Sequence, residues 1–317
     1  MTTTMRAIRV DQWGGPERLR LVEVDRPEPL PTEVQVRVHA AGVNPIDWYA
    51  SRNIAYPQTR TLPFIPGWDV AGVVSEVGYG VTTLAPGDAV FGMPRFPHPA
   101  GGYAEYVTAP ARHLCRIPAG LDFTEAAALP LAGLSAWQML VDTADVRPGQ
   151  RVLVTGAAGG VGHLAVQIAK ARGAYVIGTA SAGKHDFLRE LGADEVIDYT
   201  TADVATAVHD IDVVIQMFGG PTGTADLRTL RPGGILVSAQ GAWTPGLAEE
   251  AARLGVRATD FLVEPDQAGL RALAAMVEQG TLRVHVHTVL PLTQAASAHE
   301  VGSQSRTVGK TVLLLDH

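Results

Sequence analysis

The sequence contains a glycine-rich stretch whose spacing suits the binding of phosphate groups. It reads Val154-Thr155-Gly156-Ala157-Ala158-Gly159-Gly160-Val161-Gly162, with an apolar run before it and helical spacing after it. Glycines permit a tight turn and a close approach of backbone N–H groups to a pyrophosphate, and a helix N-terminus adds partial positive charge. The stretch therefore predicts a dinucleotide site; the alternative is a glycine-rich turn without a ligand. The residues expected to contact the cofactor are Gly156, Ala158, Gly159, Gly160, Val161 and Gly162.

The apolar run that follows, residues 175–179, ends without an acidic side chain. Dinucleotide folds that bind NAD carry Asp or Glu about 20 residues beyond the glycines, where it meets a ribose hydroxyl. Here the segment reads Thr179-Ala180-Ser181-Ala182-Gly183-Lys184, with a hydroxyl and a cation instead. A 2′-phosphate would be repelled by a carboxylate but bound by Ser181 and Lys184. We therefore predict NADPH as the cofactor; the alternative for Lys184 is a solvated residue at the start of the next helix.

The elements that must position this site alternate between apolar runs and helical patterns. The runs that read as buried strands are residues 151–155, 175–179, 195–197, 212–215 and 235–237. Thr124 is placed to cap a helix that begins at Glu125, and Gly173 stands where the helix after the glycine-rich stretch should end. Strands alternating with helices predict a parallel, doubly wound sheet of the α/β class over residues 124–263.

The residues on either side of this region have a different pattern. Residues 34–38 alternate between apolar and polar side chains, and short apolar runs at 70–77 and 89–91 flank a Pro-Gly-Asp turn. Many short strands with Gly and Pro turns predict a barrel-like β domain over residues 1–123. A further strand pattern at residues 311–315 is expected to return to that domain, so that residues 264–317 belong to it.

Composition and charge limit the classes of function. The 317 residues suggest two domains at roughly 100–200 residues each. The formal charge of −7, without a dense Lys/Arg cluster, argues against binding to nucleic acid or anionic membranes. A single cysteine, Cys115, excludes a disulfide framework. No apolar run approaches the ~20 residues that span a bilayer, and no signal-peptide core is evident, so we expect a cytoplasmic protein.

Three further motifs accompany the glycine-rich stretch. They are Ala41-Gly42-Val43-Asn44-Pro45-Ile46-Asp47, Pro66-Gly67-Trp68-Asp69 and Leu129-Pro130-Leu131-Ala132-Gly133-Leu134-Ser135-Ala136. Together the motifs resemble the zinc-free quinone oxidoreductase (zeta-crystallin-like) branch of the medium-chain dehydrogenase/reductase superfamily, over nearly the whole chain. The resemblance implies a GroES-like β-barrel domain, residues 1–123 and 264–317, interrupted by a Rossmann domain, residues 124–263.

Zinc-dependent members of that superfamily carry metal ligands at two of these positions. Here Asn44 stands where they have a Cys and Trp68 where they have a His, and their four-cysteine lobe has no counterpart. A tetrahedral catalytic zinc site is therefore not available at these positions, and we expect no metal. His285 and His287 have the spacing of a strand and could pair on a metal, but solvent-facing strand residues are the preferred interpretation.

Chemistry without a metal Lewis acid favours an acceptor that is already electrophilic. A quinone or the β-carbon of an enone can accept a hydride because the resulting charge delocalises onto oxygen. We therefore expect an NADPH-dependent quinone or α,β-unsaturated carbonyl reductase. The alternatives are an enoyl reductase of a polyketide-like intermediate, with Arg52, Arg60 or Arg95 meeting an anionic group, and an NADPH-binding sensor with little turnover.

The resemblance also implies roles for individual residues. Asn44 would offer an amide donor to a developing oxyanion and Asp47 would lie near the nicotinamide; the alternatives are a turn residue and a helix cap. Further cofactor contacts would come from Ser135, Tyr199, Phe218, Phe261, Val263 and Lys310. The substrate pocket would be lined by Tyr49, Tyr56, Phe96 and Trp243. Relatives are often homodimers joined at the edges of their Rossmann sheets, and the strand at residues 235–239 is the expected edge.

Overall fold

The chain divides into two compact units. The computed structural model describes residues 4–240, 244–304 and 307–315. Unit 1 comprises Met1–Leu134, Glu264–Gly280 and Val284–His317, and unit 2 comprises Ser135–Val263 and Thr281–Arg283. The chain passes from unit 1 to unit 2 inside helix α3 (Pro130–Trp137). The domain limits of 1–123, 124–263 and 264–317 stay a prediction.

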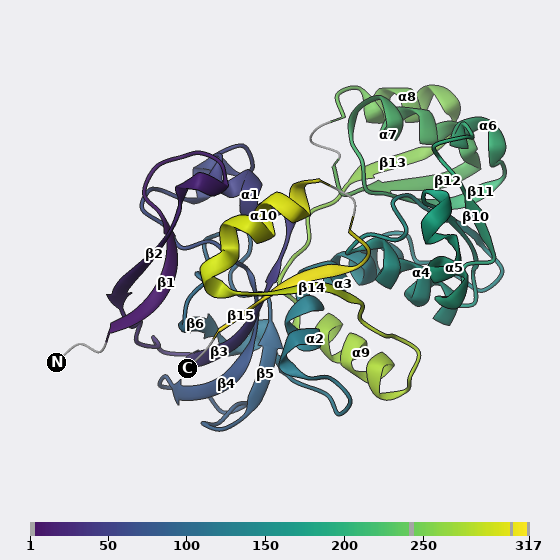
Figure 1. The fold of residues 1–317 in the computed structure, drawn as a ribbon. Helices are drawn as coiled ribbons and strands as arrows, with labels where there is room; N and C mark the ends of the chain where they lie inside the picture. Colours follow the sequence, from purple (N-terminus) through teal and green to yellow (C-terminus); the bar gives the residue numbers. More distant parts are fainter. Residues whose placement is uncertain (1–3, 241–243, 305–306, 316–317) are drawn as a thin grey trace. The chain divides into compact units, whose positions relative to one another are not determined.

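Unit 1 is built on a seven-stranded sheet with β3 in a central place. The strand order is β14-β15-β3-β4-β5-β7, and β6 also pairs with β3. The bounds are β3 (Glu33–Val43), β4 (Asp69–Val77), β5 (Ala89–Gly92), β6 (Tyr106–Pro110), β7 (Leu114–Arg116), β14 (Val286–Pro291) and β15 (Lys310–Leu314). Strand β15 runs antiparallel to β3 with Leu313 opposite Ala41, so the strand predicted near residue 311 does return to the first part of the chain (Figure 1).

Strands β1 (Thr4–Val10) and β2 (Leu19–Asp25) form a separate antiparallel pair in unit 1. Its helices are α1 (Pro45–Ser51), α2 (Phe123–Ala128), α9 (Gln267–Glu278) and α10 (Ala295–Ser303). Helix α2 starts after Asp122, whose carboxylate accepts the Glu125 backbone N–H at 2.8 Å while Glu125 accepts the Asp122 N–H. The prediction that Thr124 caps this helix was wrong, because the Asp122–Glu125 capping box satisfies two end donors at once.

Unit 2 contains a parallel sheet of six strands. The strands are β8 (Arg151–Val154), β9 (Tyr175–Thr179), β10 (Glu195–Ile197), β11 (Ile211–Gln216), β12 (Leu230–Ser238) and β13 (Arg257–Asp260). They lie in the order β10-β9-β8-β11-β12-β13, which in chain order is third, second, first, fourth, fifth, sixth. That is the doubly wound order in which the strand sequence reverses beside the first strand. The predicted α/β class and parallel sheet are therefore confirmed.

Helices connect these strands. They are α4 (Gly162–Ala171), α5 (His185–Glu190), α6 (Val204–Ala207), α7 (Gly220–Asp226) and α8 (Leu247–Leu254), and a π-helical segment, Gln138–Thr143, precedes β8. The strands of a parallel sheet are apolar because helices cover its faces. One core cluster contains a fully buried residue from each of four neighbouring strands: Leu153, Ile177, Val214 and Leu236. Gly173, at φ +80°, follows α4 as a left-handed cap, as predicted. No helix in the described parts of the chain has the length and apolarity to cross a membrane.

The sheet edge differs from the prediction. Strand β12, which contains residues 235–238, pairs with β11 on one side and β13 on the other, so it is an interior strand. The expectation that it forms the edge was wrong. Strand β13 reads Arg-Ala-Thr-Asp, and it was missed because it contains no apolar run.

Candidate active site

Unit 1 contains a group of polar side chains that are buried together. We call this group the polar centre; its members are Asn44, Asp47, Asp69, Tyr103, His299 and Lys310. Asn44 follows β3, Asp69 begins β4 and Lys310 begins β15. Because β3 pairs with both β4 and β15 at this end, with Gly42 opposite Asp69, the topology brings the three residues side by side.

The Asn44 amide is held from both of its ends. Its Nδ2 donates to Asp69 Oδ2 at 2.8 Å, and its Oδ1 accepts a hydrogen bond from the Lys310 ammonium group. Lys310 also donates to the Val43 carbonyl at 3.0 Å and lies 3.6 Å from Asp69 Oδ2. Asp69 Oδ1 in turn accepts the backbone N–H of Leu131 at 2.8 Å. A cation on one side and an anion on the other define the orientation of the amide.

Asp47 is fully buried and acts on its neighbours through one oxygen. Its Oδ2 accepts the Asn44 backbone N–H at 2.7 Å and the Tyr103 hydroxyl at 2.9 Å. Its Oδ1 is buried and has no hydrogen-bond partner among the residues that the structure describes. The geometry matches the helix-cap alternative, because Asp47 is the third residue of α1 and Asn44 is the N-cap.

Burial moves the ionisation of the polar centre toward neutrality. It raises the pKa of Asp47 to about 7, against the opposing hydrogen bonds from Asn44 and Tyr103. Burial also raises the pKa of Asp69 and lowers that of Lys310, although each charge favours the other. The group can therefore take up a proton near neutral pH, and the unpartnered Oδ1 of Asp47 is the atom with room for it.

The glycine-rich stretch of unit 2 forms a tight turn with no space for a side chain at Gly162 and little at Gly159. Gly156 follows β8 at φ +57°. A Cβ on Gly162 would lie 2.3 Å from the Gly156 carbonyl oxygen, and one on Gly159 would lie 3.2 Å from the same atom. Within the described residues, the backbone N–H groups of Val161 and Gly162 at the start of α4 have no acceptor. The turn therefore has the shape and the free donors that a pyrophosphate requires.

Most of the predicted cofactor residues follow neighbouring strands at the same edge of the sheet. Ser181 follows β9, Tyr199 follows β10, Phe218 follows β11 and Phe261 follows β13. These are the carboxyl ends of parallel strands, and β8 and β11 flank the point where the strand order reverses. A Cβ on Gly156 would lie 3.0 Å from Cζ of Phe218, so this ring lies against the glycine turn. Ligands of doubly wound sheets bind at this switch point.

Other predicted residues are placed differently. Ser135 is buried in α3, and no hydrogen bond of its hydroxyl is recorded within the described ranges. Val263 is buried. Lys184 is the last residue of the short turn Ala182–Lys184, which follows Ser181, and burial lowers the pKa of its ammonium group. Lys310 lies in the polar centre of unit 1, where its ammonium group is already bonded. Their contacts with a cofactor stay predictions.

Two of the predicted substrate residues meet in an aromatic cluster of unit 1. The rings of Tyr56 and Phe96 have centroids 6.2 Å apart, and Phe96 lies 5.8 Å from Trp68, both edge to face. Tyr49 contacts Trp48 instead, at 6.1 Å. Trp243 lies outside the described residues.

Several buried polar residues were not predicted from the sequence. Tyr103 lies 3.4 Å from His299 across 196 positions of sequence, a pairing that no local pattern reveals. In unit 2, Gln216 donates to Asp226 Oδ2 at 2.9 Å and accepts the Phe218 backbone N–H. A polar residue that ends the apolar run of β11 was the available signal for Gln216. Burial raises the pKa of Asp226 to about 6.

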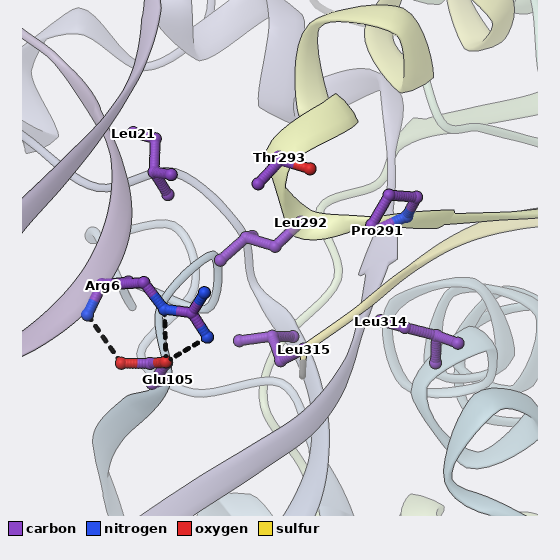
Figure 2. Close-up of a pocket in the computed structure, with 8 residues that line it drawn as sticks. All are labelled: Arg6, Leu21, Glu105, Pro291, Leu292, Thr293, Leu314 and Leu315. Atoms are coloured by element: carbon purple, nitrogen blue, oxygen red, sulfur yellow. Dashed lines mark hydrogen bonds and ion pairs between the residues drawn. The ribbon is translucent and has the colours of Figure 1, made fainter. Parts of the chain in front are cut away.

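The surface hollow drawn in Figure 2 is separate from these residues. Its walls are apolar side chains of Leu21, Leu292, Leu314 and Leu315, beside an ion pair between Arg6 and Glu105 with N···O distances of 2.7 Å. None of the predicted site residues lines it. The hollow is therefore not the predicted substrate pocket.

Comparison with protein-family models gives two matches. Residues 30–119 match the alcohol dehydrogenase GroES-like domain, and residues 191–313 match the zinc-binding dehydrogenase family. Among curated proteins, the quinone oxidoreductase of Rattus norvegicus is 38% identical over 98% of both chains. The 2-haloacrylate reductase of a Burkholderia species is 35% identical over 96% of this chain and 97% of its own.

Solved structures agree with these matches. The quinone oxidoreductase of Coxiella burnetii has a TM-score of 0.94 and 36% identity, covering 99% of this chain and 100% of its own. The mycobacterial protein Rv1454c, solved in complex with NADPH, has a TM-score of 0.88 and 33% identity, covering 98% and 99%. The predicted combination of a GroES-like domain and a Rossmann sheet is thus confirmed. The chain belongs to the zinc-free quinone oxidoreductase branch of the medium-chain dehydrogenase/reductase superfamily.

Proposed function

We propose that this chain is a zinc-independent, NADPH-dependent reductase of quinones or α,β-unsaturated carbonyl compounds. The observation that carries the proposal is the tight glycine-rich turn, Gly156 to Gly162, at the switch point of the parallel sheet. The quinone oxidoreductase relatives and the NADPH complex of a similar structure support it.

The residues present fit a dinucleotide. The turn from Gly156 to Gly162 would hold the pyrophosphate, and Phe218 beside it would limit the position of the adjoining ribose. Ser181 and Lys184 would meet the 2′-phosphate after β9, where the segment 179–184 carries no acidic residue, and Lys184 would offset the Asp198 carboxylate, which accepts a hydrogen bond from the Ala182 backbone N–H in the same turn. When bound, NADPH supplies the hydride.

The polar centre suits the charge that develops after hydride addition. Hydride adds to the β-carbon of an enone or to a quinone, negative charge develops on the carbonyl oxygen, and a proton from solvent completes the reduction. Asn44 has a second Nδ2 hydrogen without an acceptor in the described chain, and Lys310 at its Oδ1 strengthens it as a donor. Asn44 is only 1% exposed, so its amide is shielded from water. A hydrogen bond that it donates to an oxyanion would therefore not compete with solvent. Asp47, which is fully buried, acts as a positioning residue for Asn44.

NADPH absorbance tests this function directly. Metal-stripped protein is assayed with 1,4-naphthoquinone, 9,10-phenanthrenequinone and a short 2-enone, and NADH serves as the cofactor control. Oxidation that depends on the enzyme and prefers NADPH is expected, and Asn44→Ala should lower kcat about 100-fold. Tight NADPH binding without turnover of any acceptor would contradict the proposal and favour a cofactor sensor.

We also propose a homodimer. Strand β13 is one of the two edge strands of the sheet in unit 2, opposite β10, and pairs with β12 on its inner side. An open sheet edge invites pairing with a second copy. A monomer mass in light scattering would contradict this assembly.

A further inference from the structure

Unit 1 contains a buried arginine that lacks a counter-ion. The side chain of Arg60 is in a residue only 6% exposed, and Arg60 takes part in no ion pair among the described residues. Its Nη1 donates to the Ala55 carbonyl at 2.6 Å and its Nη2 donates weakly to the Thr59 hydroxyl at 3.3 Å. The Nε group is buried and has no acceptor in the described part of the chain. A buried positive charge needs an anion or neutralisation, and an arginine does not lose its proton in proteins.

Two other arginines that were considered for binding an anionic substrate already have their charge balanced by a carboxylate or by solvent. Arg95 is ion-paired with Glu33 and donates to the Thr108 carbonyl. Arg52 is exposed at the end of α1, where water solvates its charge. Arg60 is therefore the one of these three arginines whose charge is both dehydrated and unpaired.

The surroundings of Arg60 are flat and apolar. Its guanidinium carbon lies 5.8 Å from the ring centroid of Phe64 and 6.0 Å from that of Trp68. Trp68 in turn contacts Phe96, the ring that also meets Tyr56. Aromatic rings stabilise a cation but leave its N–H groups unsatisfied. The Phe64 and Trp68 rings therefore lie near the Arg60 guanidinium group but provide no acceptor for its Nε–H.

The segment that carries Arg60 joins the two acids of the polar centre. It runs from the end of α1, which contains Asp47, to the start of β4 at Asp69. It has a second buried polar atom without a partner, Oδ1 of Asn53. Among the described residues, the protein thus leaves two polar groups of this segment without partners, in a segment whose two ends lead to Asp47 and Asp69.

We propose that Arg60 is the binding residue for a carboxylate on the substrate, so that the preferred acceptors are α,β-unsaturated carbonyl compounds bearing a free carboxylate. This inference rests on the proposed reductase function and narrows its substrate class. The planar guanidinium presents Nε–H and Nη–H as a pair that matches the two oxygens of a carboxylate. The aromatic walls suit the planar conjugated part of such a molecule.

A pair of acceptors that differ in one charge tests the inference. trans-4-Oxo-2-pentenoate carries a carboxylate, and its methyl ester is neutral; both gain hydride at the carbon β to the ketone and a proton at the adjacent carbon. For the protein as it stands, kcat/KM for the acid should exceed that for the ester by about ten- to a hundredfold, as for a hydrogen bond to a charged group. Arg60→Met should remove this preference and Arg60→Lys should retain part of it.

A matched control is Arg52→Met, which removes the same charge from an exposed site at the start of the same segment and should keep the preference. A binding measurement needs no turnover: in the presence of NADP⁺, the saturated product 4-oxopentanoate should raise the midpoint of thermal unfolding of the unaltered protein, and its methyl ester should not. If Arg60→Met does not fold, Arg60→Lys and the acid–ester comparison on the unaltered protein still decide the question.

The outcomes separate this inference from the proposed function. Equal kcat/KM for acid and ester, a preference that survives Arg60→Met, or no effect of 4-oxopentanoate on unfolding would overturn the assignment of Arg60 while quinone reduction continued. Failure to oxidise NADPH with neutral quinones and with both pentenoates would instead overturn the reductase function itself.

Discussion

The buried carboxyl group of Asp226 should make the stability of unit 2 depend on pH. Asp226 is 2% exposed, and its carboxylate accepts a hydrogen bond from Gln216 at 2.9 Å. Burial raises its pKa from 3.8 to about 6, so the folded state binds this proton more tightly than the unfolded state. The stability gained from the neutral form is fully present below pH 3.8 and is lost as pH rises through about 6. At ~1.4 kcal/mol per pKa unit, the rise corresponds to about 3 kcal/mol.

Asp226→Asn should remove that loss. The asparagine keeps an oxygen for Gln216 but cannot ionise. In urea unfolding followed by circular dichroism, the variant and the parent should be nearly equally stable at pH 4, whereas at pH 8 the variant should be more stable by up to about 3 kcal/mol. Asp186→Asn is the matched control, because the Asp186 side chain is 93% exposed; it should change stability by less than about 0.5 kcal/mol at either pH. A variant of Asp226 that is less stable at pH 8, or equally shifted at both pH values, would refute the reasoning.

Three further predictions concern the cofactor and the polar centre. Gly162→Ala should weaken NADPH binding in calorimetry more than about 100-fold, because its Cβ would lie 2.3 Å from a carbonyl oxygen, and an unchanged affinity would show that this turn does not hold the cofactor. Lys184→Ala should weaken NADPH binding about tenfold or more and leave NADH nearly unchanged, so an equal loss for both cofactors would rule out a contact with the 2′-phosphate. Tyr103→Phe removes the hydrogen bond that stabilises the charged form of Asp47, so the pKa of this carboxyl should rise above about 7. The pH dependence of the free energy of unfolding should then shift to higher pH. If that pH dependence does not change, the hydrogen bond from Tyr103 does not control the ionisation of Asp47.

Local sequence patterns predicted the strands of unit 2 well. The apolar runs at 175–179 and 195–197 coincide with β9 and β10. Four of the five residues of β9 are buried, as expected for a covered parallel strand, whereas β10 is an edge strand and is half-buried throughout. Strand β13 escaped prediction because backbone hydrogen bonds alone, without an apolar run, place Arg257–Asp260 beside β12. A strand of this kind depends on its neighbour rather than on its own side chains.

The candidate residues were easier to predict than their relations. Asn44, Asp47 and Lys310 were each singled out from motifs, but the bond between Asn44 and Lys310 spans 266 positions and is set by the pairing of β15 with β3. The roles of Asp69 and Tyr103 likewise emerge only when distant strands meet. The spacing of residues in the sequence predicts local geometry, whereas the order in which the strands pair determines which residues contact a buried charge.

The return of β15 to β3 also sets an order of events during synthesis. Asn44 leaves the ribosome 266 residues before Lys310, a delay on the order of tens of seconds at usual translation rates. All six strands of unit 2 are made within this interval, so its sheet can form first. Until β15 arrives, Asp47 and Asp69 have no cation beside them, and burying them would carry a large desolvation cost. The nascent sheet of unit 1 is therefore expected to stay hydrated and incomplete during this time.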